Sequence, residues 1–150
     1  YGMANAVRPG KTPLSSMSPT IVLKDGEPVL AVGSAGGPRI ITSTLQLIIN
    51  TLDYGMMMDS AVKTPHMCCL TRDQGLELEE GFSPDTVELL EARGHKIAGT
   101  TDFGVLLVMP NGIMKKDGQF FPGGTSRVDG GGGVLTKAGT AAIDGICFKF

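Results

Sequence analysis

An Asp-Gly pair between two short β-branched runs constrains the fold of this 150-residue chain more than any other feature. The runs are Thr20 to Leu23 and Pro28 to Val32, and Lys24-Asp25-Gly26-Glu27 separates them. An Asp-Gly pair in this position is a strong hairpin signal, because a two-residue turn between strands needs positive φ at its central residues. The sequence therefore predicts two antiparallel strands joined by a tight turn.

A glycine turn and a helical pattern follow the second strand directly. Residues 33–38 read GSAGGP, and apolar residues then recur at helical spacing as far as Tyr54-Gly55: Ile41, Leu45, Ile48 and Leu52. This pattern predicts a buried helix. Gly36 and Gly37 lie at its entrance, where backbone N–H groups can approach a ligand closely and the helix dipole favours negative charge. The pair is therefore a candidate oxyanion hole, although Gly-Gly is also common at ordinary strand-to-helix turns.

Two further helices are predicted between residues 56 and 95. Met56 to Val62 is a short helix ended by Pro65, and its methionines are expected to fill gaps in the core. The segment SPDTVELLEARGH has a capping residue in Ser83 and a terminating glycine in Gly94. Its apolar face is narrow, so this helix should lie on the surface of the core.

A second hairpin is predicted toward the carboxyl end. Its strands are Val105 to Met109 and Ile113 to Lys115, joined by Pro110-Asn111-Gly112. Gly123 to Gly145 carries few large apolar residues and is expected to be loop or tail. The order of strand, strand, helix, helix, helix, strand, strand predicts a layered α+β fold with antiparallel sheet.

The composition argues against several kinds of partner. The 13 basic and 15 acidic residues give a net charge of −2 and are scattered singly, so neither nucleic acid nor an anionic membrane is an expected partner. The longest apolar runs fall far short of the roughly 20 residues that cross a bilayer. Cys68, Cys69 and Cys147 suit neither a disulfide framework nor a zinc site, and we expect free, packed thiols.

A hydroxyl-rich stretch precedes the first strand and is a second candidate site. Residues 13–20 read PLSSMSPT, where hydroxyls of Ser15 and Ser16 and nearby backbone amides could converge on a carboxylate. Serines in a turn also bond their own backbone, and that role is the commoner one for an isolated SSxS.

The remaining polar residues suggest no catalytic cluster. His66 and His95 have no Ser, Cys or carboxylate partner at an informative spacing and are expected on the surface. Glu77, Glu79 and Glu80 alternate with leucines in LELEE, which is the pattern of the solvent face of a strand. The sequence contains no GxxxxGK, GxGxxG, HExxH or paired CxxC motif. These residues by themselves indicate an α+β domain with a candidate anion pocket.

The order of these motifs resembles the γ-glutamyltransferase family, also called glutathione hydrolases. Residues 10–56 and 81–97 carry the resemblance, which is dense from Pro9 to Ile97 and thinner as far as Asp129. It implies part of the αββα sandwich of an N-terminal nucleophile hydrolase, with antiparallel sheets flanked by helices. It also implies a family domain over residues 1–133 and a divergent glycine-rich tail over residues 134–150.

The resemblance implies γ-glutamyl chemistry. Family precursors cut themselves, and the new amino-terminal threonine of the small subunit attacks the γ-glutamyl amide of glutathione, for hydrolysis or for transfer to amino acids and peptides. Ser15 and Ser16 match the serine pair that binds the γ-glutamyl group, chiefly through its α-carboxylate, and Gly36 and Gly37 match the oxyanion-hole pair. No metal or other cofactor is implied, and the family suggests a periplasmic or extracellular location.

The nucleophile and part of the substrate site are expected to come from outside this chain. A hydrolase of this class needs Thr, Ser or Cys as its first residue, with the free amine as base, whereas this chain begins with Tyr1. The resemblance places the threonine and an acidic segment upstream of this chain, and an arginine in the large subunit. The upstream segment and the large subunit are therefore expected partners. We expect the chain alone to be inactive and to associate through the unpaired edge of the first hairpin.

Several residues depart from the family pattern, and three functions stay open. Pro38 replaces the usual Ser or Thr and should hold Gly37 in an extended conformation. Residues 65–70 and 125–130 replace the PRxHHQ-like and SDPR-like runs. In the first, the chain is part of a complete γ-glutamyltransferase. In the second, it is a non-catalytic fragment or relative that binds γ-glutamyl compounds or a partner subunit. In the third, it is an acylase with a different acyl substrate. Ser15 and Ser16 favour glutamyl recognition.

Overall fold

The computed structural model describes residues 5–102, 108–127, 132–136 and 139–143. In chain order its elements are β1 (Thr20–Lys24), β2 (Glu27–Ala35), the 3₁₀ helix η2 (Gly37–Arg39), α1 (Ile40–Ile48), the π-helical turn η3 (Ile49–Asp53), α2 (Met58–Lys63), β3 (Met67–Cys68), β4 (Leu76–Glu79), α3 (Pro84–Ala92), β5 (Ile97–Thr101), β6 (Met109–Lys116), β7 (Gln119–Gly123), β8 (Gly132–Thr136) and β9 (Gly139–Ile143).

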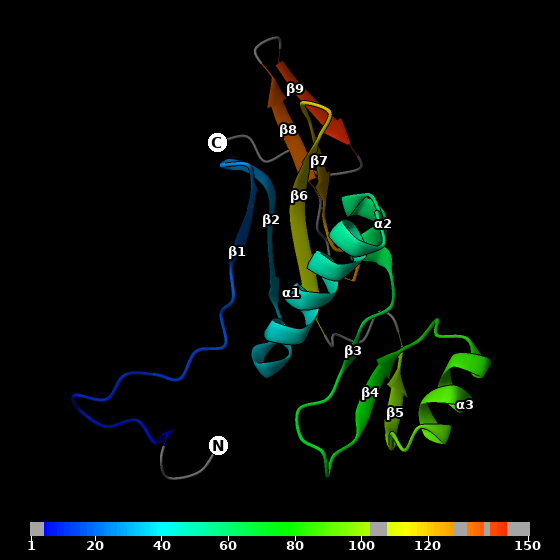
Figure 1. The fold of residues 1–150 in the computed structure, drawn as a ribbon. Helices are drawn as coiled ribbons and strands as arrows, with labels where there is room; N and C mark the ends of the chain where they lie inside the picture. Colours follow the sequence, from blue (N-terminus) through cyan, green and yellow to red (C-terminus); the bar gives the residue numbers. More distant parts are fainter. Residues whose placement is uncertain (1–4, 103–107, 128–131, 137–138, 144–150) are drawn as a thin grey trace.

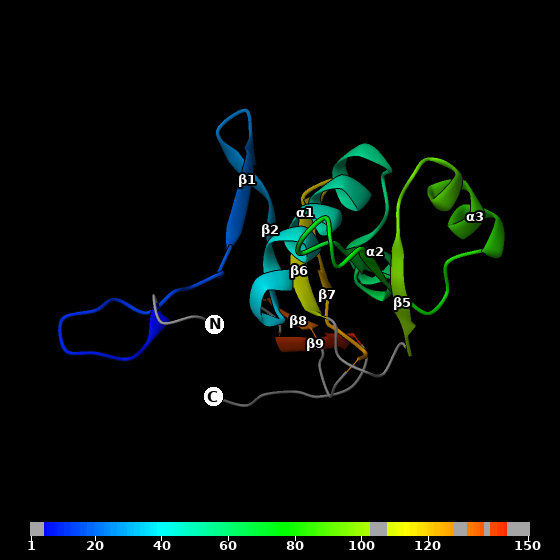
Figure 2. The same ribbon diagram turned by 90° about the horizontal axis from the view of Figure 1, so that it is seen from below.

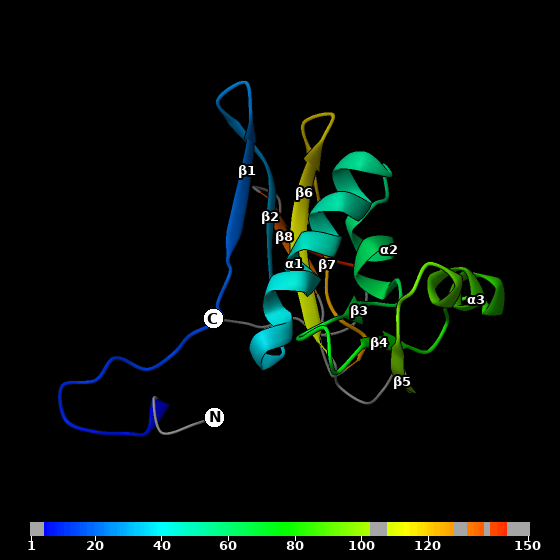
Figure 3. The same ribbon diagram turned by 60° about the horizontal axis from the view of Figure 1, so that its bottom comes forward.

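The main sheet has four antiparallel strands in the order β1-β2-β6-β7. Helices α1 and α2 lie against one face of it (Figures 1 and 3), and β8 and β9 lie on the opposite side (Figure 2). The core between the helices and the sheet consists of Leu30, Val32, Leu47, Met58, Ala61, Val62 and Met114. Met58 is fully buried there, and Met56 and Met57 pack against the cluster, so the prediction that the methionines fill the core is confirmed.

The first predicted hairpin is confirmed. Asp25 and Gly26 join β1 to β2 with φ values of 53° and 82°, as a turn with two positive φ residues requires. Its strand β1 is an edge of the main sheet, and Ile21 and Leu23 on it are 68% and 60% exposed. The predicted apolar edge is therefore present among the described strands.

The second predicted hairpin is wrong. Pro110, Asn111 and Gly112 lie inside β6, and the turn falls instead at Asp117 and Gly118, whose φ values are 51° and 74°. Gly112 is a packing glycine, because a Cβ there would lie 2.7 Å from both Met58 Sδ and Val32 Cγ1. The predicted strand from residue 105 falls partly on residues 103–107, outside the described part of the chain.

A smaller sheet, β3-β4-β5, lies beside the main sheet and carries α3 at its outer side (Figure 1). Strands β4 and β5 are parallel, joined through α3. Helix α3 is as predicted: the Ser83 hydroxyl accepts a hydrogen bond from the Thr86 N–H at 3.2 Å, Gly94 has a φ of 89°, and no residue of the helix is buried.

Residues 123–145, expected to be loop, include the hairpin β8–β9, because backbone hydrogen bonds pair glycine-rich strands without large side chains.

Helix α1 is present, but its buried face differs from the predicted one. Ile40, Ser43, Thr44 and Leu47 face the core, whereas Ile41, Leu45 and Leu52 are 57%, 52% and 46% exposed. The helix is apolar on two sides, so periodicity alone does not decide which side meets the sheet. No helix in the described ranges is long and apolar enough to cross a membrane.

Candidate functional site

The two glycines between β2 and α1 form the turn that the sequence singled out. Gly36 has a φ of 142° and Gly37 a φ of 59°, values that side-chain-bearing residues rarely adopt. The Gly36 carbonyl accepts a hydrogen bond from the Arg39 N–H at 3.2 Å, which turns the chain into η2 and α1. The first N–H groups of a helix have no partner within it, so amides at this turn suit an anion.

Pro38 does not hold Gly37 in an extended conformation, so that prediction is wrong. Pro38 is the second residue of the 3₁₀ helix and lies in its first turn, where its missing N–H costs nothing. Gly37 escapes the steric restriction before proline because it has no Cβ and can adopt positive φ. A Cβ placed on Gly37 would meet no heavy atom within 4 Å, so the space in front of this turn is open.

The serine pair lies on the arm that precedes β1. Ser15 is exposed and Ser16 is partly buried. The Ser15 Oγ accepts a hydrogen bond from the Met17 N–H at 3.2 Å, and the Ser16 carbonyl accepts one from the Ser18 hydroxyl at 3.1 Å. These are ordinary serine-turn bonds, and they leave the Ser15 hydroxyl proton available as a donor.

A single hollow of about 680 Å³ brings the predicted residues together. Ser15, Ser16 and Gly37 all line it, and Gly36 adjoins it in sequence. Arg8 and Lys11 line the same hollow, and no sequence pattern had singled them out. Figure 1 shows the arm leading away from the sheet ahead of β1, so one wall of the hollow comes from the arm and the other from the start of α1. The hollow therefore offers hydroxyl donors, backbone amides and positive charge, the groups that bind a carboxylate and an oxyanion.

Arg39 ties the glycine turn to the second sheet. Its Nε and terminal nitrogen donate to the two carboxylate oxygens of Glu77 at 2.7 and 2.8 Å. The hydrogen bonds from Arg39 lower the pKa of Glu77. Glu77 is thus half-buried in an ion pair rather than freely solvated.

A buried polar cluster lies between the two sheets, and the sequence did not reveal it. His66 and Glu79, both expected to be exposed, are 2% and 0% exposed and contact Arg127. Arg127 also donates to the carbonyls of Val62 at 2.7 Å and Thr64 at 3.1 Å. Burial and then the Arg127 charge lower the pKa of His66 to about 4, so the imidazole is neutral at pH 7. His95, in contrast, is exposed as predicted.

The cysteines carry no visible chemistry. Cys68 is buried and free, as expected, whereas Cys69 is exposed and therefore not packed. Cys147 lies outside the described residues. Among the residues that the structure describes, no group of three or more His, Cys, Asp or Glu side chains could hold a metal ion.

This chain is similar to one family model and to several known proteins. The family model described as gamma-glutamyltranspeptidase matches residues 2–132. The glutathione hydrolase proenzyme of Escherichia coli is 54% identical over 97 residues, which are 65% of this chain and 17% of that protein. The acylase ACY 1 proenzyme of a Pseudomonas species is 40% identical over 96 residues, which are 64% of this chain and 17% of that protein. A crystal structure of a mutant Helicobacter pylori gamma-glutamyltranspeptidase superposes with a TM-score of 0.73 at 38% identity, covering 85% of this chain and 69% of that one.

Proposed function

The chain belongs to the γ-glutamyltranspeptidase family, and from that premise we propose that it supplies the substrate-binding and oxyanion loops for γ-glutamyl hydrolysis or transfer. Its α+β fold is part of an N-terminal nucleophile hydrolase domain. The chain spans 17% of the E. coli relative, so the proposal places the nucleophile in another segment of a longer precursor. The large subunit and the upstream segment of that precursor are the proposed partners, and glutathione-like γ-glutamyl compounds are the proposed substrates.

The shared hollow is the observation that carries this proposal. Ser15 and Ser16 face the same open space as Gly37, at a distance in the sequence that only the fold bridges. In the proposal the serine hydroxyls donate hydrogen bonds to the α-carboxylate of the γ-glutamyl group. Arg8 and Lys11 add a positive field to the same wall, which favours a substrate that carries a carboxylate.

The glycine turn has the second role. When a hydroxyl nucleophile adds to the γ-carbonyl carbon, the C=O oxygen gains the negative charge and the N–H groups of Gly36 and Gly37 donate to it. The charge returns to the carbonyl as the C–N bond breaks, and the amine leaves with the proton taken from the nucleophile. Each preorganised donor of this kind lowers the barrier by roughly 3 to 4 kcal/mol.

Steady-state kinetics of the complete protein test this proposal. With a γ-glutamyl anilide as substrate, Ser15→Ala and Ser16→Ala are expected to raise KM by about tenfold or more, as expected for the loss of a charge-assisted hydrogen bond. Gly37→Ala is expected to lower kcat, because the positive φ of residue 37 orients the amide. Ser60→Ala, an exposed serine on α2, is the control. An unchanged KM in both serine variants would contradict the proposed binding roles of Ser15 and Ser16.

A related acylase is the second candidate function, and the 40% identity to the acylase ACY 1 proenzyme favours it. The two candidates differ in the acyl group that the hollow accepts. To separate them, glutamate and a bulkier dicarboxylic acid are compared for how well each protects the complete protein against inactivation by a reagent that modifies the nucleophile. Protection by glutamate alone supports γ-glutamyl chemistry, whereas preferential protection by the bulkier acid supports the acylase.

A further inference from the structure

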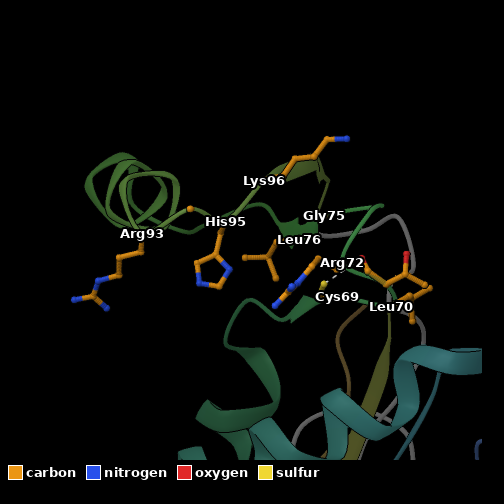
Figure 4. Close-up of a pocket in the computed structure, with 10 residues that line it drawn as sticks. Cys69, Leu70, Arg72, Gly75, Leu76, Arg93, His95 and Lys96 are labelled. Carbon is orange, nitrogen blue, oxygen red and sulfur yellow. Dashed lines mark hydrogen bonds between the residues drawn. The ribbon is translucent and has the colours of Figure 1, made fainter.

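A second hollow of about 650 Å³ lies at the end of the small sheet where β4 and β5 begin. It shares no residue with the hollow lined by Ser15, Ser16 and Gly37. Its walls are the loop between β3 and β4 and the turn between α3 and β5 (Figure 4). Four of its lining side chains are basic: Arg72, Arg93, His95 and Lys96. No aspartate or glutamate lines it.

Two hydrogen bonds of Lys96 hold the two walls together. The Leu76 N–H donates to the Lys96 carbonyl at 2.7 Å, and the Lys96 ammonium donates to the Asp73 carbonyl at 3.4 Å. Gly75 makes this approach possible, because its φ is 85° and a Cβ there would lie 2.6 Å from the Lys96 carbonyl oxygen. Arg72 is thereby brought next to residues more than twenty positions later in the chain.

The arginines here differ from the two arginines with structural roles. Arg39 and Arg127 are each bonded to a glutamate, Glu77 and Glu79. Within the described part of the chain, no ion pair is formed by Arg72 or Arg93. An ionised guanidinium that the fold does not neutralise is free to bind an anion.

The side chains divide into an inner pair and a rim. In Figure 4, Arg72 and His95 lie on either side of Leu76, while Arg93 and Lys96 extend outward from the turn. The inner pair offers a planar guanidinium fork and an imidazole. The rim offers two long cationic side chains, of which the Lys96 ammonium also bonds the Asp73 carbonyl. Such a set suits a compact anion with several oxygen atoms and more than one negative charge.

We propose that this hollow is an oxyanion site that binds a phosphate group, with Arg72 and His95 as the contacting pair and Arg93 and Lys96 as the cationic rim. The site goes beyond the proposed γ-glutamyl function and does not depend on it. Residues that follow a helix also stabilise its negative carboxyl end when they are basic. That role accounts for Arg93 at the end of α3, but not for Arg72, which comes from the other wall.

Titration calorimetry of the complete protein with inorganic phosphate tests the site, at an ionic strength held constant with sodium chloride. We expect saturable binding that Arg72→Gln weakens by about tenfold, while Arg72→Lys, which keeps the charge but loses the fork, weakens it less. Lys96→Gln is compared with Lys116→Gln, an exposed lysine at the end of β6 that removes the same charge elsewhere. We expect Lys96→Gln to weaken binding and Lys116→Gln to leave it within about twofold.

Three results would overturn the proposal. The first is that phosphate does not bind in a saturable manner. The second is that Lys116→Gln weakens binding as much as Lys96→Gln does. The third is that Arg72→Gln lowers the melting temperature without changing phosphate binding. Pyrophosphate and a phosphate monoester in place of inorganic phosphate show whether a free or an esterified group is preferred. Because these arms measure binding, their outcome is independent of γ-glutamyl activity, which Arg72→Gln is expected to leave unchanged.

Discussion

Arg127 holds Glu79 in a buried, two-pronged ion pair in which both side chains are 0% exposed. The Arg127 Nε lies 2.6 Å from one carboxylate oxygen of Glu79, and a terminal nitrogen contacts the other oxygen. The same carboxylate accepts the backbone N–H of His66 at 2.8 Å. A residue that follows β7 is thereby fixed to β4, so this pair links the two sheets.

Breaking this pair should destabilise the protein strongly. Glu79→Gln and Arg127→Met each leave one buried charge without its partner, at a cost of about 3 to 5 kcal/mol. Arg39 and Glu77 form a pair of the same chemistry but are 27% and 29% exposed. Glu77→Gln should therefore cost about 1 kcal/mol or less. Urea unfolding of the complete protein measures the difference, and equal losses at Glu77 and Glu79 would contradict it.

Stability should fall as the pH drops from about 6.5 to about 4 because of His66. Burial beside Arg127 lowers the pKa of His66 to about 4, so the unfolded chain binds a proton in this range and the folded chain does not. The unfolding free energy therefore rises with pH across the window, by roughly 3 kcal/mol from this group.

Denaturant unfolding at several pH values, compared with His66→Gln, isolates the histidine from the carboxylates that also titrate. Glu79 and Arg127 are the charged groups that contact His66, and both remain in the variant. The variant should show a shallower slope between pH 4 and 6.5. Parallel curves for the two proteins would mean that His66 does not carry the effect.

Gly112→Ala should destabilise the packing between β6 and α2. The new methyl group would lie 2.7 Å from Met58 Sδ and from Val32 Cγ1 and 3.1 Å from the Ala31 carbonyl oxygen. Overpacking of this kind costs about 1 to 3 kcal/mol.

Gly33→Ala is the matched control, because a Cβ there meets no heavy atom within 4 Å. It lies on β2 opposite Asn111, one position from the Val32–Gly112 pair. The control should change the unfolding free energy by about 0.5 kcal/mol or less. A larger loss in Gly33→Ala than in Gly112→Ala would contradict the assigned packing of α2.

The 150-residue chain by itself should associate through β1. This edge strand has an exposed backbone and presents Ile21 and Leu23, both largely exposed. Replacing these two residues by lysine should shift sedimentation-velocity profiles toward monomer. Leu89→Lys is the control, because Leu89 is 59% exposed on the separate helix α3. A monodisperse monomer before any substitution would contradict the prediction.

Local signals in the sequence predicted the parts of the fold that depend on short-range chemistry. Positive backbone φ fixes the Asp25-Gly26 turn and the end of α3 at Gly94, and one side-chain hydrogen bond, from the Thr86 N–H to the Ser83 hydroxyl, caps the start of α3. The Asp117-Gly118 turn carries the same signal within Lys116-Asp117-Gly118-Gln119, but the prediction placed the turn at Pro110-Asn111-Gly112 instead. Pro and Gly are ambiguous signals, since they also occur inside strands where a helix packs closely.

The sequence by itself determined the family, the α+β class, the Gly36-Gly37 turn and the Ser15-Ser16 pair, because each rests on residues that are contiguous in the chain. Only the tertiary structure decided which face of α1 is buried, that Ser15, Ser16 and Gly37 share one hollow, and that Glu79 and His66 are buried with Arg127. These outcomes depend on contacts between residues far apart in the chain, such as His66 and Arg127, which are 61 positions apart. No periodicity or motif encodes such a contact, since burial is a property of the packed layers and not of the local sequence.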